Sequence, residues 1–133
     1  MVIDCTSLTT ITASGTNIVS QEGHPSTNYA DNLDCQLAFD LSLVADRKIT
    51  IKFTAFNLEL GRVSCPYDWV RFWTGADSSG AEIGTKRCGS TIPTTIQADT
   101  NKVYMRFKTD VSVTRSGFRI QMIGENYSYM INS

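Results

Sequence analysis

The segment KITIKFTAFNLEL, residues 48–60, decides the fold class of this 133-residue chain. Its first half alternates strictly, with Ile49, Ile51 and Phe53 separated by polar residues. Successive side chains of a β-strand point to opposite faces of the sheet, so a period of two predicts a strand with one buried face. The segment therefore indicates a protein built on β-sheet.

Four further runs show the same alternation, and turn residues separate them. The runs are residues 35–41, 68–73, 102–107 and 117–123. Between them lie clusters such as GADSSG and CGSTIP, which are rich in turn-forming residues. No run keeps a 3.6-residue period over the length of a helix. Strands at short spacing with turns between them predict an all-β sandwich of two sheets, whose inner faces form the core.

The composition fits one globular domain and argues against two classes of function. Hydrophobic residues make up 41% of the chain and charged residues 19%, and the formal net charge is −1. The chain contains no run of Lys and Arg, so we expect no nucleic-acid partner. It also lacks an apolar stretch near the roughly 18 residues of a membrane-spanning helix, so we expect no membrane insertion.

The four cysteines, Cys5, Cys35, Cys65 and Cys88, indicate a disulfide framework. None stands in Cys-x-x-Cys spacing, and His24 is the only histidine, whereas a structural zinc site needs four closely placed ligands. An even number of well-separated cysteines is typical of a protein from an oxidising compartment. Four cysteines allow three pairings, and four reduced, buried thiols are the alternative.

Three carboxylates stand at the ends of predicted strands: Glu59, Asp68 and Asp110. If these ends meet at one edge of the sandwich, the carboxylates repel one another and one pKa rises unless a cation neutralises them. Hard oxygen ligands in this number suit calcium. In the alternative interpretation each is a solvated turn residue, with Asp110 accepting hydrogen bonds from amides of its own loop.

Catalytic motifs are missing from the sequence. It has no Gly-x-Ser-x-Gly elbow and no phosphate-binding glycine loop, and His24 lies in a turn-like segment. A glycosidase needs only a pair of carboxylates, which Glu59 with Asp68 or Asp110 would supply. We expect a protein that is not an enzyme, with a glycosidase as the minor alternative.

Motifs in a fixed order show that the chain resembles a CUB domain from Cys5 to about Gly124. They are Cys5 with TASGT, NYADNLDC at 28–35, LEL followed by CPYDWV, RCGSTIP at 87–93, and FKTDVSVTRSGF at 107–118. The resemblance implies a jelly-roll-like sandwich of two antiparallel sheets, with disulfides Cys5–Cys35 and Cys65–Cys88. With the last residues, ENYSYMINS, showing no clear alternation, we expect one domain over residues 1–124 and a mobile C-terminal tail over residues 125–133.

In the calcium-binding subtype of the family, the metal ligands match Glu59, Asp68 and Asp110 of this sequence. Tyr29 corresponds to a tyrosine that supports the site, and Ser112 to a residue of the following loop that adds an oxygen. Such sites capture a Lys or Arg side chain of a partner protein. The resemblance therefore implies a calcium-dependent protein-interaction module, secreted or in the extracellular part of a larger protein.

Other functions remain open at this point. A carbohydrate-binding module is the alternative, because some relatives bind sugars and Tyr67, Trp69 and Trp73 are candidate stacking residues. Packing of Trp69 and Trp73 in the core, on one face of their strand, is the preferred interpretation. Family members often pair, so a homo-oligomer is possible. Asn126 in Asn-Tyr-Ser fits an N-glycosylation acceptor of a secreted chain.

Overall fold

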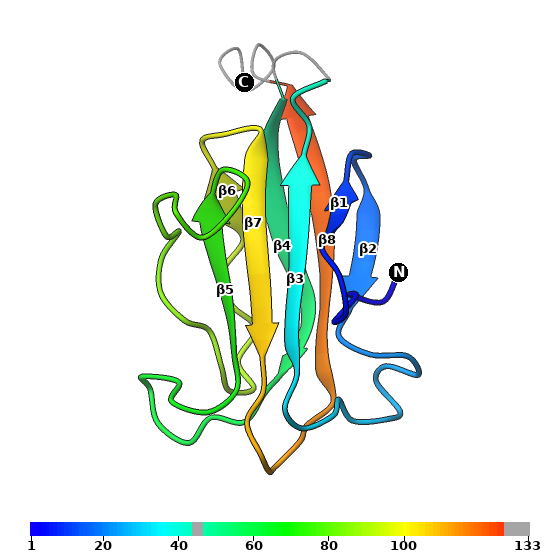
Figure 1. The fold of residues 1–133 in the computed structure, drawn as a ribbon, viewed down its shortest axis with the longest axis vertical. Helices are drawn as coiled ribbons and strands as arrows, with labels where there is room; N and C mark the ends of the chain where they lie inside the picture. The colour runs from blue at the N-terminus through cyan, green and yellow to red at the C-terminus, as the bar shows by residue number, and fades with distance from the viewer. Residues whose placement is uncertain (44–46, 127–133) are drawn as a thin grey trace.

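The computed structural model describes residues 1–43 and 47–126, which form two four-stranded sheets packed face to face (Figure 1). One sheet has the order β1-β3-β7-β5 and the other β2-β8-β4-β6. The strands are β1 (Thr9–Ile11), β2 (Thr16–Val19), β3 (Asp34–Asp40), β4 (Arg47–Asn57), β5 (Trp69–Thr74), β6 (Ile96–Ala98), β7 (Lys102–Lys108) and β8 (Gly117–Asn126). The predicted all-β sandwich is confirmed, and the described residues include no helix of the length and apolarity that would cross a membrane.

Neighbouring strands pair antiparallel, with one exception. β1 pairs parallel with β3, through Thr9–Ile11 against Leu37–Phe39. The longest pairing joins β4 to β8, and a bulge after Phe53 shifts its register. A bulge bends and twists a strand locally. Here it lies in the half of β4 that leads to Glu59.

The core lies between the sheets, where the sequence pattern places it. Leu37 and Phe39 of β3 are fully buried, as are Ile49 and Ile51 of β4. Edge-to-face ring contacts join the two sheets near one end, with 5.0 Å between the ring centroids of Phe107 and Phe118. Such aromatic pairs add about 0.5–1.5 kcal/mol beyond the apolar area that they bury.

The sequence analysis did not predict three of the strands, because they are too short to show a period. β1, β2 and β6 have only three or four residues each, and each presents one or two apolar residues to the core. β8 also extends to Asn126, so Glu125 and Asn126, which we expected in the tail, are strand residues. Residues 127–133 of that tail, with the rest of the Asn-Tyr-Ser motif, lie outside the described residues.

The disulfides are Cys5–Cys35 and Cys65–Cys88, the pairing that the family resemblance implied. The first ties the segment before β1 to the start of β3. The second joins the loops on the two sides of β5. The paired cysteines are separated by 30 and 23 positions in the sequence, and for loops of this size the chain-entropy model assigns each bond about 3–4 kcal/mol of stabilisation.

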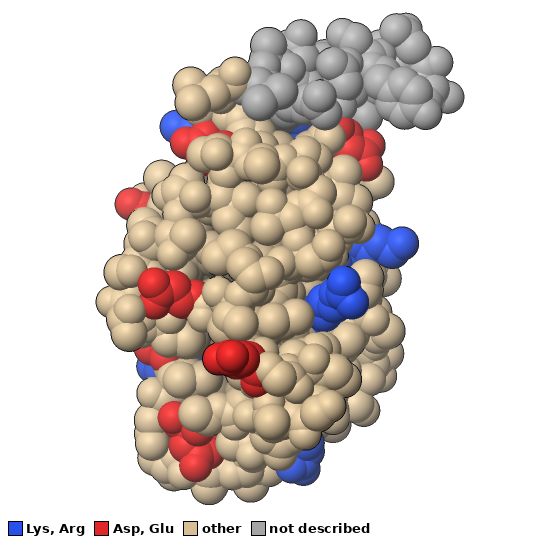
Figure 2. All heavy atoms as spheres, turned by 90° about the vertical axis from the view of Figure 1, so that its right-hand side faces the viewer, with Lys and Arg blue, Asp and Glu red and all other residues tan. Residues whose placement is uncertain are grey.

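Charges on the flank of the sandwich are dispersed. Figure 2 shows acidic and basic side chains in small separate groups on the side where β1 and β2 lie. Mixed signs at this spacing largely cancel beyond a Debye length of about 8–10 Å. This face therefore presents no field of a single sign.

The outer face of β5 carries a stack of aromatic and cationic side chains. Trp69 and Trp73 do not pack in the core, contrary to our expectation, because Val70 and Phe72 are the residues of this strand that enter it. The two indoles lie on the outer face, yet only 8% and 6% of their surfaces are exposed. The Arg71 guanidinium lies between them, 5.3 Å from the Trp69 ring centroid and 4.6 Å from that of Trp73. Glu82 accepts two hydrogen bonds from this guanidinium, at 3.0 and 2.6 Å. Glu82 thus holds the cation over both indoles.

Replacing Glu82 by glutamine tests this stack. The hydrogen bonds from Arg71 lower the pKa of Glu82, so the carboxylate adds stability above the pKa of an unfolded glutamate and loses it as the pH falls through the folded pKa. We expect Glu82→Gln to lower the free energy of unfolding by about 1 kcal/mol at pH 7. The gap to the wild type should begin to narrow as the pH falls below about 4, near the pKa of an unfolded glutamate, and narrow further through the lowered folded pKa.

Urea denaturation across pH 3–8 measures both quantities. Asp99→Asn is the matched control, because Asp99 pairs with Lys48 but is 87% exposed. We expect its effect to stay within about 0.5 kcal/mol. Equal losses in the two variants, or a Glu82→Gln loss that does not narrow between pH 7 and pH 3, would contradict the interpretation.

Candidate metal site at one end of the sandwich

Three strand ends from both sheets meet at the lower end of the molecule in Figure 1. Glu59 lies two residues after β4, Asp68 lies directly before β5, and Asp110 lies two residues after β7. β4 belongs to one sheet and β5 and β7 to the other. The structure therefore brings together the three carboxylates that the sequence analysis selected.

The spacing of the carboxylates suits a single cation. One oxygen from each of Glu59, Asp68 and Asp110 lies within 4.8 Å of the other two. Oxygens that share one calcium ion at 2.3–2.6 Å lie at most about 5 Å apart. Oε1 of Glu59 is buried and has no hydrogen-bond partner, which leaves an acceptor unsatisfied at this point. The donor set and its geometry fit a hard divalent cation.

Asp68 is the buried member of the cluster. None of its surface is exposed. Its Oδ2 accepts a hydrogen bond from the Tyr29 hydroxyl at 2.6 Å, and its Oδ1 accepts one from the Asp110 amide at 2.9 Å. Burial raises the pKa of Asp68, and these two hydrogen bonds act in the opposite direction. The pKa remains above its ordinary value, so the buried charge is only partly compensated by the protein.

Tyr29 connects two of the three acidic residues. Its ring is buried against Phe107, with 5.4 Å between the centroids. Its hydroxyl donates to Asp68 and accepts a hydrogen bond from the Glu59 amide at 3.2 Å. Burial and the bond to Asp68 raise the pKa of Tyr29 far above its ordinary value, so the hydroxyl keeps its proton. These two hydrogen bonds are a physical basis for the supporting role that the resemblance implied for Tyr29.

The pKa of Glu59 is raised above its ordinary value by the surroundings of the cluster. Desolvation is the largest cause of this shift, and the negative charges of Asp110 and Asp68 raise the pKa further. Arg115 opposes the shift. Both effects disfavour the charged carboxylate, and a cation bound between the three groups would reverse them.

Thr109 fixes the loop that carries Asp110, and the sequence analysis did not identify it. Its side chain is buried, accepts a hydrogen bond from the Leu33 amide at 2.8 Å and donates one to the Ala30 carbonyl at 2.9 Å. The Asn32 amide also donates to the Asp110 carbonyl, at 2.8 Å. A neutral threonine beside an aspartate carries no distinctive sequence signal, so only the fold reveals this role.

Ser112 lies in the exposed loop after Asp110. Its amide donates to Oδ1 of Asp110 at 3.3 Å. This is the local turn bond that the alternative interpretation of Asp110 described, and it coexists with the cluster. A metal–oxygen contact from Ser112 stays a prediction.

His24 lies elsewhere and does not join the carboxylates. It lines a cavity of about 450 Å³ together with Val19, Thr54 and Arg119, on the outer side of the sheet that contains β8. Burial lowers its pKa, and the charge of Arg119 lowers it further. The imidazole is therefore not placed to serve the cluster as a base.

Comparison with known proteins identifies the family. The family model described as CUB domain matches residues 5–122. The chain belongs to the CUB domain family. Human cubilin is 39% identical over 104 residues, which cover 78% of this chain and 3% of cubilin. Exoskeleton protein RP43 of Riftia pachyptila is 36% identical over 110 residues, covering 77% and 25%. The CUB chain thus spans a quarter or less of these two relatives.

Solved CUB structures have the same fold. The full extracellular region of zebrafish Gpr126/Adgrg6 matches with a TM-score of 0.72 and 26% identity, over 92% of this chain and 15% of that one. The MASP-1 CUB2 domain bound to Ca²⁺ matches with a TM-score of 0.70 and 24% identity, over 86% and 96%. Family membership and two disulfides place the chain in an extracellular setting.

Replacing Tyr29 by phenylalanine tests the support of the cluster. Asp68 then loses a donor while it stays buried, so we expect the free energy of unfolding in EDTA at pH 7 to fall by about 1–3 kcal/mol. Because the pKa of Asp68 is already raised and rises further in this variant, the loss should shrink as acid protonates the carboxyl. Chemical denaturation at neutral and acidic pH measures both effects.

Tyr67→Phe is the matched control for this substitution. Tyr67 is 40% exposed, and its hydroxyl has no hydrogen-bond partner within residues 1–43 and 47–126. We expect its removal to leave stability unchanged. If Tyr29→Phe were as stable as Tyr67→Phe at pH 7, the bond to Asp68 would not support the site.

Proposed function

We propose that this CUB domain is a calcium-dependent protein-interaction module that captures a lysine or arginine side chain of a partner protein. The observation that carries the proposal is the cluster of Glu59, Asp68 and Asp110, whose carboxylate oxygens lie within 4.8 Å of one another. The unpartnered, buried Oε1 of Glu59 supports it. Ca²⁺ bound to the structurally similar MASP-1 CUB2 domain agrees with the choice of metal.

Calcium matches this donor set better than other common metals. All three side chains offer hard oxygen ligands, and the cluster contains neither sulfur nor imidazole, which zinc and copper prefer. Calcium accepts 6–8 oxygens in flexible geometry, so backbone carbonyls, water and the proposed ligand Ser112 can complete its shell. Bound calcium would relieve the repulsion that raises the pKa of Glu59.

The metal-loaded cluster would retain attraction for a cation. Three carboxylates carry three negative charges and Ca²⁺ carries two positive ones, so one negative charge remains. Glu59 and Asp110 are partly exposed, whereas Asp68 is closed off. Their outer oxygens can accept charge-assisted hydrogen bonds from an ammonium or guanidinium group. Such a contact favours fast, salt-dependent association.

The outer face of β5 supports a protein partner over a glycan. A sugar-stacking platform needs exposed aromatic rings, but Trp69 and Trp73 are almost fully covered by Arg71 and its neighbours. The fully buried Asp68, with both oxygens accepting hydrogen bonds, also has no open approach for a nucleophile. We infer binding rather than glycoside hydrolysis.

Calcium should stabilise the domain through the acidic cluster. At a calcium concentration 100 times the Kd, we expect a gain of about 2.7 kcal/mol in the free energy of unfolding. Glu59→Gln and Asp110→Asn should abolish this gain, because each removes a charged ligand. Thermal denaturation with calcium and with EDTA, together with calorimetric titration of calcium, measures the effect.

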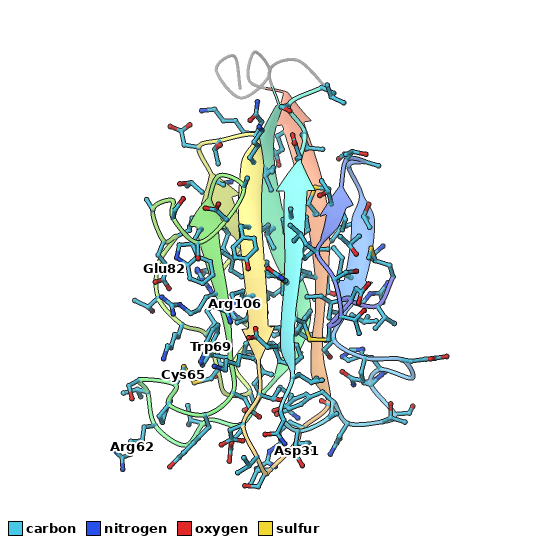
Figure 3. The ribbon with its side chains drawn as sticks, in the orientation of Figure 1. Asp31, Arg62, Cys65, Trp69, Glu82 and Arg106 are labelled. Carbon is cyan, nitrogen blue, oxygen red and sulfur yellow. A yellow bond between two sulfur atoms is a disulfide. The ribbon has the colours of Figure 1, made fainter. Side chains whose placement is uncertain are left out.

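Asp31→Asn is the control, because Asp31 is an exposed carboxylate at the same end of the molecule (Figure 3). We expect it to keep the full calcium response. Amide hydrogen exchange across residues 111–116 should slow when calcium is added to the wild type and to Asp31→Asn. Identical denaturation of the wild type in calcium and EDTA would refute the metal site.

Capture of a basic side chain can be tested with a minimal probe. We expect N-acetyl-lysine amide to shift the NMR amide signals of Glu59 and Asp110 only when calcium is present. N-acetyl-norleucine amide, which lacks the ammonium group, should not shift them. The lysine shifts should weaken between 50 and 500 mM salt, because screening reduces the attraction. Equal responses to both probes would contradict capture of a charge.

A further inference from the structure

Exposed apolar side chains gather at the acidic end of the domain. The described residues include ten large hydrophobic side chains that are exposed, and six of them lie in the loops around the cluster. These six are Leu60 (51%), Val63 (95%), Tyr67 (40%), Ile92 (52%), Val111 (75%) and Val113 (43%). A concentration of exposed apolar residues beside polar ones is typical of an interaction surface.

Part of this surface is a groove with a volume of about 420 Å³. Its apolar lining includes Leu60, Val63, Ile92 and Pro93, and the Cys65–Cys88 disulfide contributes to its wall. Figure 3 labels Cys65 at this corner of the molecule, beside the start of β5. The groove is large enough for one bulky apolar side chain and the backbone next to it.

Close packing fixes the walls of the groove. A Cβ atom on Gly89 would lie only 3.3 Å from Cδ1 of Leu60, and the Leu58 amide donates to the Gly89 carbonyl at 2.9 Å. In the loop between Leu60 and Val63, which both line the groove, a side chain on Gly61 would collide with the ring of Tyr67. The disulfide ties the two loops together. A groove that is already formed lowers the entropy cost of binding.

Charged residues of both signs adjoin the groove. Leu60 directly follows Glu59 of the acidic cluster, so one end of the groove borders the proposed calcium site. Lys86 lines the groove as well, and its ammonium lies 5.4 Å from the ring centroid of Trp69. The apolar lining is therefore adjoined by the acidic Glu59 and contains the basic residues Lys86 and Arg87.

We infer that the groove binds an apolar side chain of the same partner segment that supplies the captured lysine or arginine. The matching segment has the complementary order: a basic residue, then a large apolar residue, then an acidic residue facing Lys86. This inference rests on the proposed function, since the basic residue sets the position of the segment. It assigns specificity to a surface outside the carboxylate cluster.

A displayed peptide library tests the inference. Two libraries have random positions around a central residue, which is lysine in one and glutamine in the other, and both are selected on the calcium-loaded domain. We expect the lysine library to be enriched over the glutamine library. On one side of the lysine we expect leucine, isoleucine, methionine or phenylalanine, followed by aspartate or glutamate.

Variants of the groove locate the preference on the structure. The double variant Val63→Ser/Ile92→Ser changes two exposed residues, and we expect it to bind the selected peptides at least about tenfold more weakly. Its calcium-induced thermal shift should equal that of the wild type. Lys86→Gln should reduce only the preference for the acidic residue. Leu43→Ser is the control, because Leu43 is 90% exposed and lies at the opposite end of the sandwich.

The outcomes separate this inference from the proposed function. If lysine were enriched with no apolar preference, or if the double variant kept full affinity, binding of an apolar side chain in the groove would be refuted. Capture of a basic side chain at the calcium site would not be affected. If the lysine library were not enriched over the glutamine library on the calcium-loaded domain, both the groove inference and the capture of a basic side chain would be refuted. Apolar binding that persists in EDTA without lysine would also overturn the inference, because the proposed occupant joins the two features in one segment.

Discussion

The hydrogen bond from Tyr29 to the buried carboxylate of Asp68 is the constraint on which the functional end of this domain depends. A buried charge is costly unless hydrogen bonds compensate it. The tyrosine hydroxyl and the Asp110 amide each satisfy one oxygen of Asp68. The same hydroxyl also accepts a hydrogen bond from the Glu59 amide. Glu59 follows β4, which belongs to the other sheet from the β5 strand next to Asp68. The hydrogen bonds that assemble the acidic cluster therefore also link the ends of the two sheets.

Sequence periodicity predicts the long strands of this fold and which side chains share a face, because each long strand has one buried face. Val103, Met105 and Phe107 are fully buried as the alternation requires, while Arg106 on the opposite face is paired with Asp34. β1 and β6 are too short to show a period, and their places come from tertiary pairing. The alternation also separated Trp69 from Val70 and Phe72 but did not show which of the two faces is the core. The burial of Trp69 on the outer face depends on cations from neighbouring residues.

The carboxylates of the site could be selected from the sequence, but their convergence could not be deduced from it. A position at a strand end is compatible with either end of a sandwich until the strand order is known. The motif resemblance supplied that missing information for Glu59, Asp68 and Asp110. It gave no hint of Thr109, whose hydroxyl joins two loops, nor of the unsatisfied oxygen on Glu59. Such features arise from packing between residues far apart in the chain.

The acidic end combines repelling charges with exposed apolar side chains, and both work against stability in the absence of ligands. The rest of the domain offsets this cost with a buried aromatic core and two cross-links. The Cys65–Cys88 bond has a particular place in this balance, since it lies in the wall of the apolar groove. Without the bond, the loops bearing Val63 and Ile92 would be free to move relative to each other, and the groove between them would lose its fixed shape. The cross-link ties the two loops together, and the same rigidity keeps the groove in a fixed position relative to Glu59. A partner segment can then meet charge and apolar surface together, without first reordering either loop.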